Sequence, residues 1–266
     1  MKVICIYLTL SVFVFVSCNQ EQAETQGNKS AIKNTLLFEE NFNGEELNSK
    51  VWNYDLGDGC PNLCGWGNNE RQLYTKENVA VNDGQLVITS TKQDSLYHSG
   101  KIHTKDKFEF QYGTVEVKAK LPTGYGLWPA IWMLGHDIDT KGWPACGEID
   151  IMEYVGKEPN VLYTSLHTPS SFGNTINSKK TLVKNLEEGY HVYKTKWTSE
   201  AITFYINDKE MYKYAPKEKN DETWPFDKSF YIIMNTAIGG NFGGPKVDDS
   251  IFPKKFEVDY VRVYSL

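Results

Sequence analysis

Short runs of alternating apolar and polar residues follow one another along this chain from Leu36 onward. Val, Ile, Tyr, Phe and Thr dominate the runs, and turn-forming residues separate them, as in Asn82-Asp83-Gly84 and Asn207-Asp208. This rhythm predicts an antiparallel all-β domain, a β-sandwich or jelly roll, and no stretch has a helical period over three turns. The clearest predicted strands lie within residues 78–92, 112–122, 147–156, 191–199, 201–211, 229–240 and 256–266.

Two of these runs also predict how far a strand is buried. In residues 112–120, Val115, Val117 and Ala119 share one face, and charged side chains occupy the opposite face. That alternation predicts a half-buried strand. In residues 257–264, apolar or aromatic side chains occur at both parities, which predicts that both faces are covered near the C-terminus.

The first residues of the chain have a different composition. The apolar run at residues 3–16 follows one lysine and is too short to span a bilayer, so residues 1–17 are predicted to be a secretory signal peptide. Cys18 directly follows a small residue at the end of this run, which resembles the lipobox of bacterial lipoproteins and predicts lipidation of Cys18. Ordinary cleavage near Ser17 and free secretion form the alternative.

Residues 18–33 contain almost no large apolar groups and predict a flexible tether. Residues 34–266 are then expected to form a single domain, because all-β sandwiches of this size commonly stay single. The formal net charge of −6 argues against nucleic acid or an anionic membrane as the main partner. We expect a monomer whose contact with a membrane is made only through its lipid anchor.

Composition points to a further partner class and to one crosslink. The 7 Trp and 16 Tyr exceed what burial alone usually requires, so some rings are expected to face a ligand. Beyond the tether the cysteines are Cys60, Cys64 and Cys146. An oxidising compartment allows one pair to bridge, with Cys60 and Cys64 nearest in sequence, and leaves one thiol over. The pairing stays open at this point.

The segment GEIDIMEY, residues 147–154, breaks the alternation. On a regular strand Glu148 and Asp150 share one face, whereas Glu153 turns to the other. A β-bulge inserts one residue and restores the face of whatever follows, and bulges occur preferentially beside active sites. A bulge around Ile151-Met152 is therefore predicted, which places all three acids on one face.

Three acids on one face provide the groups that hydrolyse a glycosidic bond. The outer Cα atoms would lie about 13 Å apart, and converging side chains bring the carboxyls to about 5 to 6 Å, close to the separation in a retaining glycosidase. Carboxylates this close raise one another's pKa, so one keeps a proton near neutral pH. We assign Glu148 as nucleophile, Glu153 as acid/base and Asp150 as the group that orients and tunes Glu148. A solvated acidic strand face and a calcium or magnesium cluster are the alternatives.

Several segments follow one another in the order of a known family: GYGLWPAIWMLG at 124–135, GEIDIMEYVG at 147–156, WPFDKSFYIIMNTAIGGNFGG at 224–244 and VDYVRVY at 258–264. They resemble the family-16 glycoside hydrolases, most closely their bacterial laminarinase branch, over most of the chain from Leu36 onward. The resemblance implies a concanavalin A-like jelly roll with an open substrate cleft on its concave face. It also implies retaining, endo-acting cleavage of β-glucan.

The family's nucleophile, assisting Asp and acid/base map onto Glu148, Asp150 and Glu153. Laminarinases, agarases and carrageenases carry the bulged motif, whereas mixed-linkage lichenases usually carry E-x-D-x-E. Enzymes for sulfated galactans tend to place basic residues near the cleft, and no such cluster surrounds the motifs here. The predicted substrate is therefore the β-1,3-glucan laminarin. The alternatives are a same-fold hydrolase for mixed-linkage β-glucan or a galactan, and a non-catalytic glucan-binding lipoprotein.

Aromatic residues near the motifs are candidates for sugar binding. Trp128 and Trp132 lie four residues apart, so a regular strand puts both on one face, where indole rings can stack on sugars. Two core tryptophans form the alternative. Trp143, just before the acidic strand, is a further candidate platform.

The resemblance adds three polar candidates for sugar binding. Asn68 and Glu70 lie in a segment similar to the family's W-G-N-x-E at the glycone side of the cleft, and His167 matches a His that touches the aglycone sugar. Polar residues in a Gly-rich loop are also ordinary turn chemistry, and a lone His is more often structural. Lys101 stands where relatives often have Arg.

The predicted reaction needs no cofactor, but the resemblance implies a structural calcium far from the chemistry. Its matching positions are Glu40, Asn41, Gly84 and Asp259. Relatives usually have Asp-Glu where this chain has Glu40-Asn41, so the lower ligand charge is expected to weaken the site. The predicted location is the bacterial cell envelope, through the lipid anchor on an outer-membrane, surface or periplasmic face, with secretion as the alternative.

Overall fold

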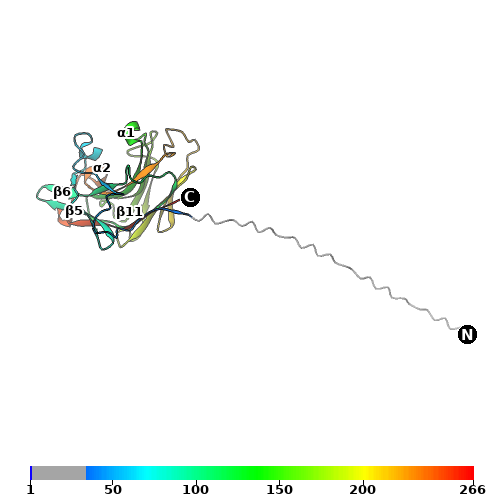
Figure 1. Cartoon of the computed structure of the whole chain (residues 1–266), viewed down its shortest axis with the longest axis horizontal. Coiled ribbons are helices and arrows are strands. Elements are labelled where there is room, and N and C mark those ends of the chain that lie inside the picture. Colours follow the sequence, from blue (N-terminus) through cyan, green and yellow to red (C-terminus); the bar gives the residue numbers. More distant parts are fainter. Residues whose placement is uncertain (2–33) are drawn as a thin grey trace. The chain divides into compact units, whose positions relative to one another are not determined.

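The computed structural model describes Met1 and residues 34–266, and residues 34–266 form one unit built from strands (Figure 1). The predicted signal peptide, Cys18 and the tether fall outside the described residues. Within the described part, no helix is both long and apolar enough to cross a membrane.

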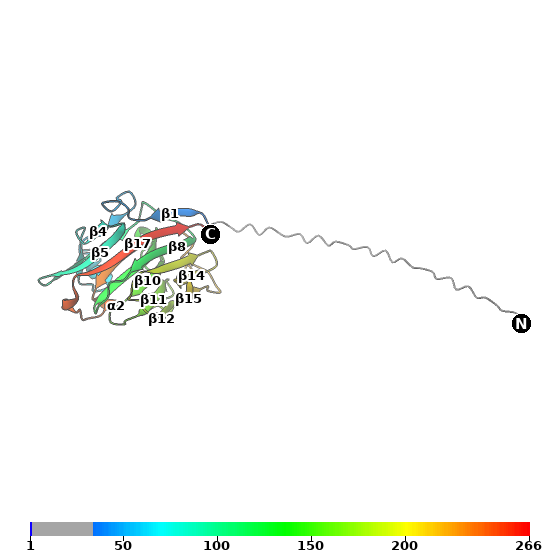
Figure 2. The same ribbon diagram turned by 90° about the horizontal axis from the view of Figure 1, so that it is seen from below.

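Two stacked sheets make up residues 34–266, which confirms the predicted all-β jelly-roll sandwich. Figure 2 shows strands of the ten-stranded sheet side by side, with strands of the seven-stranded sheet behind them. The helical elements are short: α1 (Ile138–Lys141), α2 (Gly240–Gly243) and the 3-10 turns η1 (Cys64–Gly67) and η2 (Asp249–Ile251).

Strand order shows how the chain crosses between the sheets. The ten-stranded sheet runs β15 (Lys209–Tyr214), β14 (Ile202–Ile206), β13 (His191–Trp197), β8 (Gly113–Lys120), β17 (Lys254–Tyr264), β5 (Gln85–Gln93), β6 (Leu96–Ser99), β3 (Gln72–Tyr74), with β1 (Leu36–Glu40) beside β17 and β4 (Val79–Asn82) beside β5. The seven-stranded sheet runs β12 (Ser178–Leu182), β11 (Val161–His167), β10 (Glu148–Tyr154), β9 (Leu127–Gly135), β16 (Phe230–Ile238), β7 (Lys101–His103), β2 (Asn53–Tyr54).

The core includes the inward-facing side chains of both sheets. In β8, Val115, Val117 and Ala119 are fully buried, while the charged side chains between them stay partly exposed, as the alternation predicted. Each buried face takes apolar surface out of water, and every Å² of that surface stabilises the folded sandwich by roughly 25 cal/mol. This packing leaves the opposite faces of both sheets for polar residues.

The last strand, β17, differs from its prediction. Its pairing with β8 shifts register between Val258 and Tyr260, which marks an irregularity of the β-bulge type. The shift lets Val258, Val261 and Val263 all enter the core, although their spacing in the sequence mixes both parities. The other face of the strand is partly exposed. The expectation that both faces are covered here was therefore wrong, because an inserted residue changes which side chains share a face.

Two predicted turns and one crosslink are present. Asp83 and Gly84 both have positive φ, as do Asn207 and Asp208, which is typical of the tight turns that join hairpin strands.

Cys60 and Cys64 form a disulfide. Within residues 34–266 the remaining thiol, Cys146, is buried, and burial raises its pKa to about 12, so little of it is the nucleophilic thiolate near neutral pH.

Candidate active site

Strand β10 carries the three predicted acids and contains a register shift between the second and the third. Asp150 pairs with Ser165 of β11, whereas Glu153 pairs with Tyr163, so three steps along β10 match two along β11. Against β9 the same shift lies between Asp150 and Met152. The predicted bulge is confirmed.

The bulge decides which side chains of β10 face the core. Ile151 and Met152 are consecutive, yet both are buried in the core together with Ile149 and Tyr154. Two inward residues in succession return the next polar residue to the outer face. We call this outer face of β10 and its neighbouring strands the acidic face, after Glu148, Asp150 and Glu153.

Glu153 is held from both adjacent strands. Trp128 Nε1 on β9 donates to Glu153 Oε1 at 3.0 Å, and Ser165 Oγ on β11 donates to Oε2 at 3.5 Å. The side chain is only 9% exposed. Burial first, and then the charge of Asp150, raise the pKa of Glu153 well above its ordinary value. The carboxyl therefore holds a proton at a higher pH than a solvated Glu, as a general acid requires.

Asp150 lies between the two glutamates and is almost completely buried. Its Oδ2 is 3.2 Å from His167 Nε2 on β11. Burial, and then the neighbouring Glu148, raise the pKa of Asp150 well above its usual range. A protonated Asp150 can donate a hydrogen bond to Glu148 and so orient the predicted nucleophile.

Trp128 and Trp132 lie on the acidic face, so the alternative of two core tryptophans was wrong. Both side chains are half-buried within β9, while the residues between them are buried. Trp132 pairs with Asp150, and its Nε1 donates to Asn235 Oδ1 of β16 at 2.8 Å. The two indoles therefore lie along one side of the strand that carries the acids.

Trp143 lies next to the predicted nucleophile. Its Nε1 donates to Glu148 Oε2, and its ring centroid is 5.7 Å from that of His167 and 5.3 Å from that of Phe172. Trp143 and Phe172 are 45% and 51% exposed. Exposed rings beside a carboxylate provide apolar surface that a sugar can cover.

Asn68 and Glu70 belong to one hydrogen-bonded group. Asn68 Nδ2 donates to Glu70 Oε1 at 3.3 Å, while Gln72 Nε2 and Tyr74 OH donate to Glu70 Oε2 at 2.6 and 3.1 Å. Burial raises the pKa of Glu70, and these hydrogen bonds oppose the shift. The group is more than the turn chemistry that a Gly-rich loop predicts.

Hydrogen bonds link this group to the acidic face. Asn235 Nδ2 donates to Tyr74 OH at 2.9 Å, and Asn235 Oδ1 accepts from Trp132. Lys101 lies beside them, with Nζ 4.0 Å from the centroid of the Trp66 ring and 5.3 Å from that of Trp132. Hydrogen bonds through Asn235 of β16 therefore link the candidates from the W-G-N-x-E segment to Trp132 of β9.

Sequence reasoning missed several residues of the acidic face. Ser165 could have been found, because it shares the parity of His167 on β11, as Tyr163 does. Phe242 in α2 had no such signal, since it lies in a Gly-rich segment. Its ring centroid is 5.4 Å from that of Trp128 and 4.9 Å from that of Tyr163.

The side-chain oxygens of the candidate calcium ligands already have protein partners. Glu40 Oε1 accepts from the backbone N–H of Phe42 at 2.9 Å, and Asn41 Oδ1 accepts from Arg262 Nη2 at 3.4 Å. Asp259 Oδ2 is 2.6 Å from Lys118 Nζ. Gly84, in the β4–β5 turn, can offer only its main-chain carbonyl. A cation here would compete with two basic side chains.

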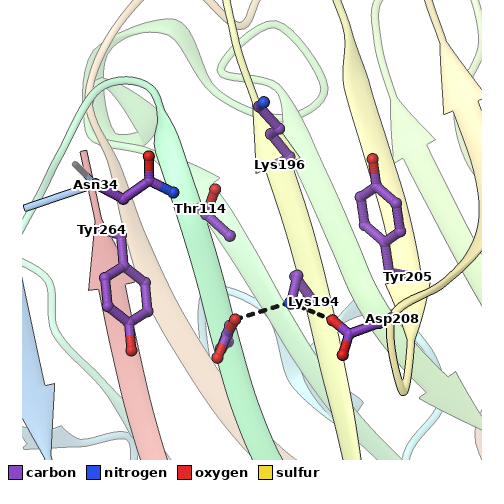
Figure 3. A pocket seen from close by; sticks show the side chains of 8 residues that line it. Asn34, Thr114, Lys194, Lys196, Tyr205, Asp208 and Tyr264 are labelled. Carbon is purple, nitrogen blue, oxygen red and sulfur yellow. Dashed lines mark hydrogen bonds and ion pairs between the residues drawn. The ribbon is translucent and has the colours of Figure 1, made fainter. Parts of the chain in front are cut away.

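A pocket on the ten-stranded sheet lies away from the acids. Figure 3 shows Tyr264 and Tyr205 at its two sides, with Lys194 and Asp208 between them. Lys194 Nζ is 2.8 Å from Glu116 Oε1 and 2.6 Å from Asp208 Oδ1. Lys194 therefore bridges the two carboxylates, and its charge offsets only part of theirs.

Comparison with known proteins places the acidic face in a family. Residues 67–262 match the profile of glycosyl hydrolases family 16. A glucan endo-1,3-β-glucosidase A1 of Niallia circulans is 41% identical over 86% of this chain, and this chain spans 37% of its length. A β-glucanase of Rhodothermus marinus is 38% identical, covering 86% of this chain and 84% of that protein.

A solved structure shows the same fold. A laminarinase from Flavobacterium sp. UMI-01 is 56% identical and superimposes with a TM-score of 0.86, covering 87% of this chain and all of that one. The similarity extends through both sheets, since it includes most of residues 34–266. Strand β10 and the acidic face therefore lie within the region that these proteins share.

Proposed function

Because the chain belongs to glycosyl hydrolases family 16, we propose that it is a retaining, endo-acting hydrolase of β-1,3-glucan such as laminarin. The observation that carries the proposal is the bulged strand β10, which holds Glu148, Asp150 and Glu153 on one face. The names of the similar proteins, an endo-1,3-β-glucosidase, a β-glucanase and a laminarinase, support the choice of substrate.

The proposed reaction has two steps. Glu148 attacks the anomeric carbon and forms a covalent glycosyl-enzyme, while Glu153 donates its proton to the oxygen of the departing sugar. Glu153, now ionised, then takes a proton from water, and that water attacks the anomeric carbon and releases Glu148. The raised pKa of Glu153 supports the first role, because the group is protonated when the substrate arrives.

The sugar contacts that we propose lie on both sides of the acids. Trp128, Trp132 and Trp143 offer rings for stacking, which the half-buried or exposed positions of these side chains support. The polar partners would be Asn68, Glu70 and His167. Such contacts hold the glycosidic bond in reach of both glutamates and lower the entropy lost on reaching the transition state.

A reducing-sugar assay tests the proposal directly. Wild-type protein is incubated with laminarin, lichenan, agarose and carrageenan, with Glu148→Gln as the matched inactive control. We expect release from laminarin above all, and a loss of at least about 10³-fold in kcat for the control. If the protein cleaved only agarose or carrageenan, its substrate would be a galactan and not laminarin. Binding to laminarin without release from any polymer would identify a glucan-binding protein instead.

We also propose a weak structural calcium at Glu40, Asn41, Gly84 and Asp259. The contacts of Lys118 with Asp259 and of Arg262 with Asn41 support weak binding, because calcium must displace basic side chains that already contact these oxygens. Calcium should therefore raise the Tm of wild-type protein only at millimolar concentration. Lys118→Ala should increase that effect, and EDTA should cancel it in both proteins.

Location in the cell is a further part of the proposal. We infer a monomeric lipoprotein of the bacterial cell envelope, anchored through Cys18, from the apolar run and the small residue that precede this cysteine. Fractionation of the producing cells tests this, since Cys18→Ala should move the protein from the membrane fraction to the soluble fraction.

A further inference from the structure

We propose that the acidic face binds a divalent transition-metal ion such as zinc through Glu148, Asp150 and His167, and that the bound ion inhibits hydrolysis. One ligand atom from each of these residues lies within 4.8 Å of the other two. The group joins β10 to β11, so its members are fixed by strand pairing rather than by one flexible loop.

A buried oxygen in this group lacks a hydrogen-bond donor. Asp150 Oδ2 has no hydrogen-bond partner among the described residues, and the side chain is only 4% exposed. It lies 3.2 Å from His167 Nε2, and within residues 34–266 no other basic side chain comes within ion-pair distance of the three acids. A dication supplies the positive charge that these crowded carboxyls lack.

The spacing of the atoms fits a tetrahedral ion. Zinc bonds of about 2.0–2.2 Å place two ligand atoms roughly 3.3 Å apart, and Asp150 Oδ2 and His167 Nε2 are already 3.2 Å apart. Glu148 and His167 are partly exposed, and Glu148 has to approach the other two by a side-chain rotation. With three protein ligands, the fourth position stays open to water.

The donor set predicts which ions bind and how tightly. An imidazole with two carboxylates suits zinc, copper or nickel, whereas calcium and magnesium prefer oxygen ligands alone. His167 Nδ1 has no hydrogen-bond partner among the described residues. Tight sites usually fix that second nitrogen with a carbonyl or carboxylate, so we expect micromolar rather than nanomolar affinity.

Inhibition follows from the identity of one ligand. An ion on Glu148 occupies the carboxylate that has to attack the anomeric carbon, so zinc and substrate cannot both use it. This consequence rests on the proposed function, but metal binding itself does not. The two are therefore measured separately.

Binding is measured without activity, by titration calorimetry of zinc chloride into tag-free full-length Glu153→Gln protein. Glu153 is not a proposed ligand, and this background prevents hydrolysis from entering the result. We expect one site per chain and an increase in Tm with zinc. Adding His167→Gln should weaken binding at least tenfold. Adding His136→Gln, which removes an exposed imidazole outside the group, should leave it unchanged.

Two further measurements make the outcome decisive. Circular dichroism checks that each variant is folded, and Asp150→Asn replaces His167→Gln if that variant is not. X-ray absorption at the zinc edge should show nitrogen and oxygen neighbours. Sulfur neighbours would assign the metal to a cysteine and overturn the proposal, as would unchanged binding in folded His167→Gln or equal binding of magnesium.

Inhibition is then tested with wild-type protein and laminarin. Zinc should lower the rate, EDTA should restore it, and magnesium at the same concentration should have no effect. Zinc binding without inhibition would overturn the role of Glu148 as a ligand. Absence of hydrolysis in metal-free protein would contradict the proposed function and leave the calorimetric result as it stands.

Discussion

Burial on the acidic face sets which carboxyl keeps its proton. A solvated Glu side chain has a pKa of about 4.3. It would be ionised at neutral pH and could not donate a proton to a leaving sugar. Glu153 is buried between β9 and β11 and lies beside Asp150, and both effects raise its pKa. The indole of Trp128 opposes them, because its N–H stabilises the ionised carboxylate.

Trp128→Phe should therefore move the alkaline limb of kcat/KM to higher pH. Loss of the indole donor destabilises the ionised form of Glu153, which raises its pKa further. The pH profile of laminarin hydrolysis measures the shift. Ser165→Ala serves as the comparison, since its 3.5 Å contact is longer and should matter less. A shift of the Trp128→Phe limb to lower pH would contradict this reasoning.

Asp150→Asn should stabilise the protein at neutral pH while reducing activity about 10- to 100-fold. The folded-state pKa of Asp150 is raised, so its carboxyl favours folding fully only below its unfolded pKa. That contribution is lost as pH rises through the raised folded pKa. Asn has nearly the same shape as Asp but cannot ionise, so Asp150→Asn does not lose this stability as the pH rises.

Thermal unfolding at two pH values checks this prediction. The Tm difference between Asp150→Asn and wild type should be larger at pH 7 than at pH 4. For a domain of this size each kcal/mol corresponds to about 2–4 °C. Asp259→Asn, which removes a partly exposed ion pair with Lys118, should change stability by less than about 1 kcal/mol. An equal Tm difference at both pH values would argue against a buried, protonated Asp150.

Strand β10 shows how one inserted residue changes a site. Without the shift between Asp150 and Glu153, the third acid would enter the core and an apolar residue would face the substrate. β17 contains a second register shift, between Val258 and Tyr260, which sends Val261 and Val263 inward. In both strands the apolar residues change parity along the sequence, and the register shift lets them all face the core.

Deleting Met152 should convert β10 to a regular strand and change substrate preference. The shortened motif alternates as E-x-D-x-E, so Glu153 stays on the acidic face but moves one strand position, about 3.3 Å, toward Asp150. We expect the ratio of laminarin to lichenan hydrolysis to change at least tenfold.

Met152→Ala is the matched control for that deletion. It keeps the bulge and removes a fully buried side chain, so it should cost about 2–5 kcal/mol of stability and leave the substrate ratio unchanged. If the deletion also left the ratio unchanged, the link between bulge and specificity would be wrong. The roles of the acids would still stand.

The whole sandwich is contained in residues 34–266. Both sheets and the buried core cluster lie within this range, beginning with Leu36 in β1 and ending with Tyr264 in β17. The short disulfide between Cys60 and Cys64 is also inside it. All strands of the acidic face therefore belong to this unit.

A chain that starts at residue 34 should fold and hydrolyse laminarin like the longer protein. Its kcat/KM should agree within about twofold and its Tm within about 2 °C, because no core residue is removed. Steady-state kinetics and calorimetry on both forms measure this. A large loss of Tm would mean that earlier residues pack on the sandwich.

The alternation along the chain was enough to predict the longer strands β5, β8, β10, β13, β14, β16 and β17, the two hairpin turns and the bulge in β10, whereas short strands such as β2, β3 and β7 were not predicted. Side-chain parity and turn preference are properties of neighbouring residues, so they can be read locally. The same reasoning failed at β17, where its apolar residues at both parities were taken as burial of both faces. Only pairing with β8 shows which face is buried.

Tertiary structure alone decided how the acids are tuned. It brings Trp128 to Glu153 and His167 to Asp150, and it links Glu70 to Trp132 through Tyr74 and Asn235. The first two contacts join strands that follow one another in the chain, whereas the last one joins β3, β16 and β9, which are distant in sequence. The order of strands in a sheet is not encoded in any single strand. Burial, which raises the pKa of Glu153 and Asp150, is likewise a property of the packed sheets, since one strand by itself excludes no water.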